Sequence, residues 1–305
     1  MPTASPEVVG SRRRLRLPGR EARTAYLLLA PVLLVFACFV FVPLVLTFAT
    51  SLQEKRAFGP AEWVGLENFR ELGGDRVFWR ALANTVGYAA ITVPLSLALG
   101  LALALLLNGG MWLRGLFRTV YYLPVVISGI AIGILAFWMF DEQVGVVNKL
   151  LEGVGLSPVA WRSSPLWASV SIVVSTLWFR VGFCMVIYLA ALQSIPREYY
   201  DASAVDGASP WQQFRWITLP LLRMATVVLA IYGVIESFQV FDIVYVLTRG
   251  GPGDSTTVLG IYAYDQAFET RQRGYGATIG VVLFLLLMVV LLAQWRLTRH
   301  RGENA

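Results

Sequence analysis

Six long apolar segments limit the fold of this chain more than any other feature. A helix needs about 20 mostly apolar residues to cross the hydrocarbon core of a bilayer. Six segments are long enough, at 25–49, 81–107, 119–140, 166–192, 224–247 and 277–295. Only 14% of the 305 residues are charged, against about a quarter in soluble domains. The sequence therefore predicts an all-α integral membrane protein with six transmembrane helices, forming one domain over 25–295.

Four prolines lie inside these apolar segments, at positions 31, 43, 94 and 124. Proline removes a backbone hydrogen bond, which a membrane helix tolerates where neighbouring groups or water satisfy the freed carbonyl. We expect these prolines to bend or locally open their helices. The first segment follows a basic stretch, as a secretory signal does, but its apolar run is too long and no small-residue cleavage site follows.

The arginines and lysines favour one orientation. If the N-terminus is cytoplasmic, 14 of the 25 Lys and Arg residues lie on the inner side and 10 in the outer loops. Cytoplasmic loops carry the excess of positive charge in membrane proteins. We therefore expect both termini in the cytoplasm, as a basic N-terminal tail over 1–24 and a basic C-terminal tail over 296–305.

The sequence offers few groups for catalysis or metal binding. His300 is the sole histidine, and Cys38 and Cys184 both lie within apolar segments, where thiols are usually buried. The chain has no phosphate-loop motif. The net charge of +6 reflects arginine-rich ends on an apolar body, which fits membrane topology better than nucleic-acid binding. We expect no enzyme activity, no metal and no cofactor bound by this chain.

Between the fourth and fifth apolar segments, residues 194–220 read as a helix, a glycine turn and a second helix. Ser194 and Pro196 favour a helix start, and Gly207 supplies a left-handed stop. Ser209-Pro210-Trp211-Gln212 has the pattern of a capping box, and Leu219-Pro220 favours a helix end. Small residues at 202–204 suggest a slim exposed face for docking. A structured cytoplasmic loop without a partner is the alternative interpretation.

The spacing within this segment resembles the EAA loop of permease subunits in binding-protein-dependent ABC importers. The family pattern is E-A-A, a glycine after three residues, then nine residues and I-x-L-P. This chain has Asp201-Ala202-Ser203, Gly207 and Ile217-Thr218-Leu219-Pro220, so two positions of the triplet depart. Further stretches resemble the carbohydrate-type permeases, namely 83–85, 122–124, 192–196 and 241–253.

The resemblance implies a multi-subunit transporter in the cell membrane. Its expected partners are a second permease subunit, usually a different chain, two ATPase subunits that use ATP and Mg²⁺, an extracytoplasmic solute-binding protein and membrane lipid. The EAA loop would fit a cleft in an ATPase subunit and pass its motion to the membrane helices. The residues implied in this coupling are Asp201, Ala202, Ser203, Asp206, Gly207, Ala208, Leu219 and Pro220.

Polar side chains within the apolar segments predict a substrate pathway. Such groups are costly in lipid and are functional hypotheses by default. The fourth segment carries Arg180, and the fifth carries Glu236, Gln239 and Asp242. Tyr232 shares a helical stripe with Glu236 and Gln239, and Phe238 and Trp178 are aromatic neighbours in sequence that could cover a sugar ring. Alternatively, Arg180 and Glu236 form an ion pair that only locks two helices together.

These observations favour the permease subunit of an ABC importer that takes up a sugar. A related polar solute, such as a glycerol phosphate, is an alternative. An ion-coupled secondary transporter is a second alternative, because Glu236 and Asp242 are carboxylates within apolar segments. A membrane enzyme is the third, and the shortage of catalytic groups argues against it.

Overall fold

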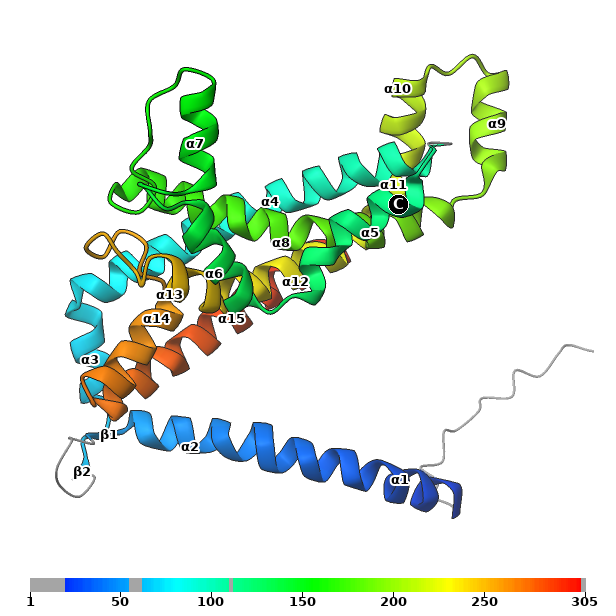
Figure 1. Ribbon diagram of the computed structural model, residues 1–305. Coiled ribbons are helices and arrows are strands. Elements are labelled where there is room, and N and C mark those ends of the chain that lie inside the picture. The colour runs from blue at the N-terminus through cyan, green and yellow to red at the C-terminus, as the bar shows by residue number, and fades with distance from the viewer. Residues whose placement is uncertain (1–19, 55–61, 110–111, 303–305) are drawn as a thin grey trace, which may run out of the picture. The chain divides into compact units, whose positions relative to one another are not determined.

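Helices make up most of the computed structural model, which describes residues 20–54, 62–109 and 112–302 (Figure 1). The strands of the described part are β1 (Gln53–Glu54) and β2 (Glu62–Trp63), which pair antiparallel with Gln53 opposite Trp63. The chain divides into two units, Met1–Thr47 and Phe48–Ala305. Each unit is described separately below.

The described part of the first unit is helical. It consists of α1 (Arg20–Phe36), the π-helical turn η1 (Ala37–Phe41) and the first residues of α2 (Val42–Ser51). The wider π turn lies just before Pro43, which cannot donate the usual helical hydrogen bond. Residues Thr24–Ser51 form an apolar helix long enough to span a membrane, matching the first predicted segment.

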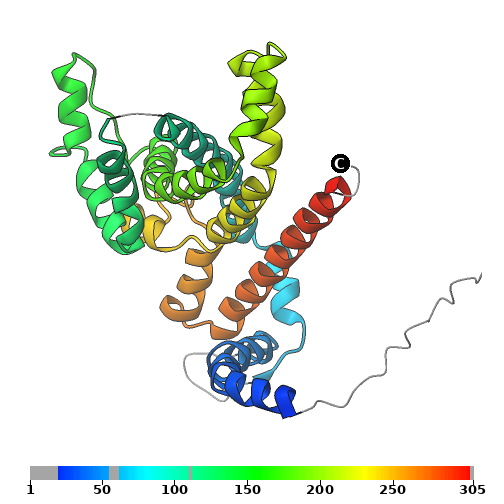
Figure 2. The same ribbon diagram turned by 90° about the vertical axis from the view of Figure 1, so that its right-hand side faces the viewer.

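The second unit is built on four longer helices: α4 (Arg76–Asn108), α8 (Pro165–Gln193), α12 (Arg223–Phe238) and α15 (Arg273–Gly302). The α4–α8 contact is the most extensive, and α12 packs on α4 and α15 (Figure 2). The helices α4 and α8 and residues 273–296 of α15 are apolar enough to span a membrane. These three confirm the predicted segments 81–107, 166–192 and 277–295.

The other two predicted segments are interrupted. Over 119–140 the chain forms α5 (Arg114–Tyr122), the 3₁₀ turn η2 (Leu123–Val126) and α6 (Gly129–Met139), with a bend of 103° before α6. Over 224–247, α12 ends at Phe238 and α13 (Asp242–Leu247) begins after three non-helical residues. Among the described residues, six spans result only if two bent helix pairs each count as one span, namely Arg114–Val126 with Gly129–Met139 and Pro210–Leu221 with Arg223–Phe238.

The broken helices pack on each other, since α6 lies against α13. Gly129 and Gly133 of α6 face Asp242 and Val246 of α13, with too little space for an added Cβ. Ser128 caps α6 by accepting a hydrogen bond from the backbone N–H of Ala131. The two interrupted segments are therefore joined to each other at their breaks.

Short elements cover the end of the bundle where α4 begins. They are α3 (Glu67–Gly74), α7 (Val146–Gly153), α14 (Leu259–Tyr264) and η4 (Asp265–Glu269). Asp75 caps α4 and accepts hydrogen bonds from the Tyr262 and Tyr275 hydroxyls. Burial works to raise the pKa of Asp75, but these hydrogen bonds outweigh it and the pKa lies below its usual range.

A hairpin over 140–164 carries α7 and is held by side-chain hydrogen bonds. The Asn148 side chain accepts from the backbone N–H of Val159 and the indole N–H of Trp161, and it donates to the carbonyl of Glu142. Glu142 in turn accepts from the backbone N–H of Arg162. These hydrogen bonds tie the start of the hairpin to its end, which gives it a defined shape.

Glycines allow the backbones of neighbouring helices to touch. A Cβ at Gly100 of α4 would lie 2.4 Å from the Cβ of Cys184 on α8. A Cβ at Gly182 of α8 would lie 2.0 Å from the carbonyl oxygen of Tyr121 on α5. Small residues at such crossings are typical of membrane helix packing, which depends on close contact.

We predict that Gly182→Ala destabilises the protein. The added methyl group meets a backbone carbonyl that cannot rotate away, and overpacking of this kind costs about 1–3 kcal/mol. The matched control is Gly280→Ala on α15, where an added Cβ meets nothing within 4 Å. Thermal unfolding of the purified protein in detergent should give a lower Tm for Gly182→Ala and an unchanged or higher Tm for Gly280→Ala. Equal Tm values for both variants would contradict the packing described here.

Candidate functional site

The segment between α8 and α12 forms a helix–turn–helix at the end of the bundle where α4 and α8 terminate (Figure 1). Its elements are α9 (Arg197–Val205), α10 (Pro210–Gln213), the π turn η3 (Phe214–Thr218) and α11 (Leu219–Leu221). Gly207 has a φ of 79°, which confirms the predicted left-handed stop. The capping box of Ser209 and Gln212 is present with both of its hydrogen bonds, as predicted.

The start of this segment differs from the prediction. Ser194 terminates α8 and its hydroxyl donates to the Ala191 carbonyl, so it does not cap α9. Pro196 stands at the N-cap of α9 instead. The end agrees with the prediction, because α11 ends at Leu221, directly after Leu219-Pro220, and the chain then bends by 61° into α12. Proline is tolerated there because it lies in the first turn of α11.

Hydrogen bonds brace the inner faces of the two short helices. The Ser203 hydroxyl donates to the Tyr200 carbonyl and lies 3.0 Å from the Gln213 amide nitrogen, which donates to it. The Tyr200 hydroxyl lies 3.0 Å from that of Thr218. Ser203 is therefore half-buried between the helices, and the expectation that it lies on the slim exposed face is wrong.

The outer face of this segment is exposed and carries little bulk around its turn. The residues of the predicted coupling set that are exposed are Asp201, Ala202, Asp206, Gly207 and Pro220. Ala208 and Leu219 are half-buried. Val205 is 89% exposed and Trp211 is 68% exposed. The helix–turn–helix is held together by internal hydrogen bonds and is joined directly to α12. A partner that binds its exposed face of small and apolar residues could therefore move α12.

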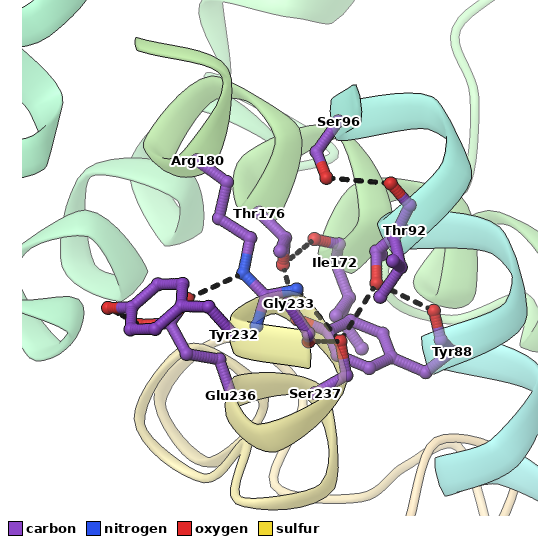
Figure 3. Close-up of polar contacts among 11 residues, drawn as sticks. Tyr88, Thr92, Ser96, Ile172, Thr176, Arg180, Tyr232, Gly233, Glu236 and Ser237 are labelled. Atoms are coloured by element: carbon purple, nitrogen blue, oxygen red, sulfur yellow. Dashed lines mark hydrogen bonds and ion pairs between the residues drawn. The ribbon is translucent and has the colours of Figure 1, made fainter. Parts of the chain in front are cut away.

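A second group of polar side chains lies inside the bundle, centred on Arg180 (Figure 3). Arg180 of α8 is only 7% exposed. Its Nε donates to Glu236 Oε2 over 3.0 Å, and another guanidinium nitrogen donates to the Ser237 hydroxyl over 2.8 Å. A buried charge requires such compensation. The structure therefore contains the Arg180–Glu236 ion pair that the sequence left as one of two interpretations.

The hydrogen bonds extend from this pair to α4. Tyr232 donates to Glu236 Oε1 over 2.6 Å, one helical turn away on α12. The Ser237 hydroxyl lies 3.4 Å from that of Thr92 on α4. Tyr88, also on α4, lies 2.8 Å from the Thr176 hydroxyl on α8. Polar side chains from three helices thus meet in an otherwise apolar interior.

Two cavities adjoin the Arg180–Glu236 pair. The larger has a volume of about 270 Å³, and the smaller about 90 Å³. Arg180, Glu236 and Phe179 line both cavities. The remaining lining of the larger cavity is Tyr88, Gly129, Thr176, Gln239, Val240, Phe241, Asp242 and Ile243. Polar and aromatic side chains are therefore combined around one space, an arrangement suited to a solute with both hydroxyl groups and ring faces.

The structure brings together five of the seven residues predicted for the substrate pathway. Arg180, Glu236, Gln239 and Asp242 line the larger cavity, and Tyr232 lines the smaller one with Arg180 and Glu236. The two aromatic residues lie elsewhere. Trp178 is 45% exposed and lines neither cavity, and Phe238 is buried against Ala89 and Leu287.

Sequence reasoning missed several lining residues, of which Tyr88, Thr176, Phe179 and Phe241 carry a hydroxyl or an aromatic ring. Thr176 lies four residues before Arg180, so the helical repeat places it on the same face. Phe179 is adjacent to Trp178, and the position in the helical turn decides which of the two rings faces the cavity. Tyr88 lies far from these residues in the sequence, and nothing in its local sequence indicated that it lines the cavity.

In the described part of the chain, no three His, Cys, Asp or Glu side chains lie close enough to hold a metal ion. Cys184 is buried and Cys38 is exposed, and both are free thiols.

Comparison with known proteins places this chain in a family. Residues 96–300 match the model of the binding-protein-dependent transport system inner membrane component. The trehalose/maltose transport system permease protein of Thermococcus litoralis is 34% identical over 94% of this chain and 98% of its own length. The lactose transport system permease protein of Rhizobium radiobacter is 36% identical over 90% of this chain and 94% of its own length.

A solved structure agrees with these sequence relatives. A bacterial ABC transporter involved in the import of the acidic polysaccharide alginate matches with a TM-score of 0.80 and 26% identity, covering 92% of this chain and 96% of that chain. The fold, the helix–turn–helix between α8 and α12, and these matches agree with one another. The chain belongs to the inner membrane components of binding-protein-dependent transport systems, the permease subunits of ABC importers.

Proposed function

We propose that this chain is a permease subunit that carries a sugar through the cell membrane. The observation that carries the proposal is the larger cavity, where charged, amide, hydroxyl and aromatic side chains converge inside an apolar bundle. The relatives named for lactose and for trehalose and maltose support a sugar as the solute, because this chain aligns with them over nearly its whole length. The residues of the pathway are Arg180, Glu236, Gln239, Asp242 and Tyr232.

The transport cycle requires partner chains. A second permease subunit completes the pore, two ATPase subunits hydrolyse ATP with Mg²⁺, and a solute-binding protein delivers the sugar. The alginate transporter has been solved in complex with a periplasmic protein that holds an alginate pentasaccharide, and this supports the last of these partners. The chain itself supplies no ATPase site and holds no cofactor.

The helix–turn–helix over 194–220 is the proposed contact with an ATPase subunit. Its exposed residues Asp201, Ala202, Asp206 and Gly207 form the contact surface, and its braced helices pass movement to α12. We infer from this contact that 194–220 and the C-terminal end of α15 lie in the cytoplasm, in keeping with the orientation that the Lys and Arg residues of the sequence favour. Sugar enters from the opposite face, where α3, α7 and α14 lie.

The central test is uptake of lactose or maltose by proteoliposomes that contain the full complex. We expect uptake that needs both ATP and the solute-binding protein. It should disappear when the catalytic glutamate of the ATPase subunits is replaced. Uptake driven by an imposed ion gradient without ATP would instead identify an ion-coupled transporter.

For the contact surface, we predict that Ala202→Trp or Gly207→Pro uncouples ATP hydrolysis from transport. Tryptophan at 202 adds bulk to the docking face, and proline cannot adopt the positive φ of residue 207. Uptake should fall at least tenfold in both variants while membrane insertion stays normal. The matched control is Ala160→Trp, at an exposed alanine in the hairpin at the opposite end of the bundle. Normal uptake by both loop variants would remove the role assigned to this segment.

A double replacement distinguishes the two interpretations of the Arg180–Glu236 ion pair, which are contact with the sugar and locking of α8 to α12. Glu236→Leu alone leaves Arg180 buried without its counter-charge, and breaking a buried pair costs about 3–5 kcal/mol. Arg180→Met together with Glu236→Leu removes both charges, so we expect the Tm to recover. Uptake should remain low in the double variant if the pair contacts the sugar. Recovery of both Tm and uptake would show that the pair only locks α8 to α12.

A further inference from the structure

The charges around the larger cavity indicate which solutes this half of the pathway accepts. The cavity is lined by one cation, Arg180, and by two carboxylates, Glu236 and Asp242. The cation is already engaged, because Arg180 donates to Glu236 Oε2 and to the Ser237 hydroxyl. The lining therefore carries a formal charge of −1 and presents no cation without a counter-charge.

The second carboxylate lies against the start of a helix. A Cβ added at Gly129, the first residue of α6, would lie 2.8 Å from Asp242 Oδ2. The positive end of the α6 dipole is therefore next to a carboxylate of this chain and is partly neutralised by it. An anionic solute entering the cavity would find this helix end already occupied by negative charge.

We propose that the cavity selects uncharged polyhydroxylated solutes and rejects anionic ones, such as sugars bearing phosphate, sulfonate or carboxylate groups. Binding an anion here would need the rupture of the Arg180–Glu236 pair, which leaves the half-buried Glu236 carboxylate without its counter-charge. An uncharged sugar can bind without breaking the Arg180–Glu236 pair. Its hydroxyl groups donate to the carboxylates and pair with the Gln239 amide, and its ring faces pack on Phe179 and Phe241.

This inference rests on the proposed transport of a sugar and refines it. Family membership does not decide the charge of the solute, because a transporter of similar structure imports the acidic polysaccharide alginate. The distinction therefore depends on this chain's own side chains. It can be tested without knowing which sugar is carried.

The test measures the reactivity of a cysteine in the cavity with charged reagents. Cys38→Ser and Cys184→Ala remove the native thiols, and Val240→Cys places a reporter in the lining. The full complex is treated with a cationic trimethylammonium methanethiosulfonate and with an anionic sulfonate methanethiosulfonate. Leu150→Cys, an exposed site on α7, gives the reference ratio of the two rates.

We expect the cationic reagent to be favoured at Val240→Cys, relative to the reference, by about threefold or more. One unit charge about 6 Å away in water changes the local concentration of a monovalent reagent by about this factor. Asp242→Asn should bring the ratio toward the reference value. Glu236→Gln should likewise bring it toward the reference value, because Arg180 and Asp242 then leave the lining without a net formal charge. Asp141→Asn, the same change in the 140–164 hairpin, should leave the ratio at Val240→Cys unaltered.

Three results would overturn the inference. They are a preference for the anionic reagent in the parent, no response of the ratio to either Asp242→Asn or Glu236→Gln, and no reaction of Val240→Cys with either reagent. The reagents act without turnover, so a complex that fails to import sugar still reports the charge of the cavity. Failure of the proposed function and failure of this inference are therefore observed separately.

Discussion

One buried guanidinium determines how α8 and α12 are joined. Arg180 lies in an apolar interior with 7% of its surface exposed, and a charge in such surroundings is stable only when it is paired and hydrogen-bonded. Glu236 and Ser237 meet both needs from successive positions of α12. The Ser237 hydroxyl also lies close to that of Thr92 on α4, so the polar contacts around Arg180 extend to a third helix. The position of the cavities follows from this arrangement.

The cost of burying polar groups also explains which parts of the site the sequence could predict. Arg180, Glu236, Gln239 and Asp242 stand out because they are polar within apolar segments, and all four line the same cavity. Phe238 is aromatic in an aromatic-rich segment, so nothing local shows that it packs against Ala89 and Leu287. Tyr88 lines the cavity because α4 packs beside α8. That packing brings together residues far apart in the sequence, and helical periodicity does not predict it.

The helix breaks were predictable only where proline marks them. Pro124 begins a 3₁₀ turn and the chain bends sharply just beyond it, whereas Pro94 lies within an uninterrupted α4. The break at 239–241 contains neither proline nor glycine. It is held by tertiary contacts instead, including the packing of the Phe241 ring against that of Tyr264 on α14, with 5.3 Å between the ring centroids. Hydrophobicity alone does not distinguish a continuous transmembrane helix from one that ends early because of contacts with other parts of the chain.

The contact between Gly100 and Cys184 has a mechanical consequence. Where two backbones touch, one helix cannot slide or tilt against the other without steric overlap on one side or an empty space on the other. The α4–α8 pair therefore behaves as a rigid body during any conformational change. The bend at Leu222 and the break at 239–241 interrupt the regular helix on either side of α12, so a change of direction between α12 and its neighbours along the chain would be absorbed at these two places.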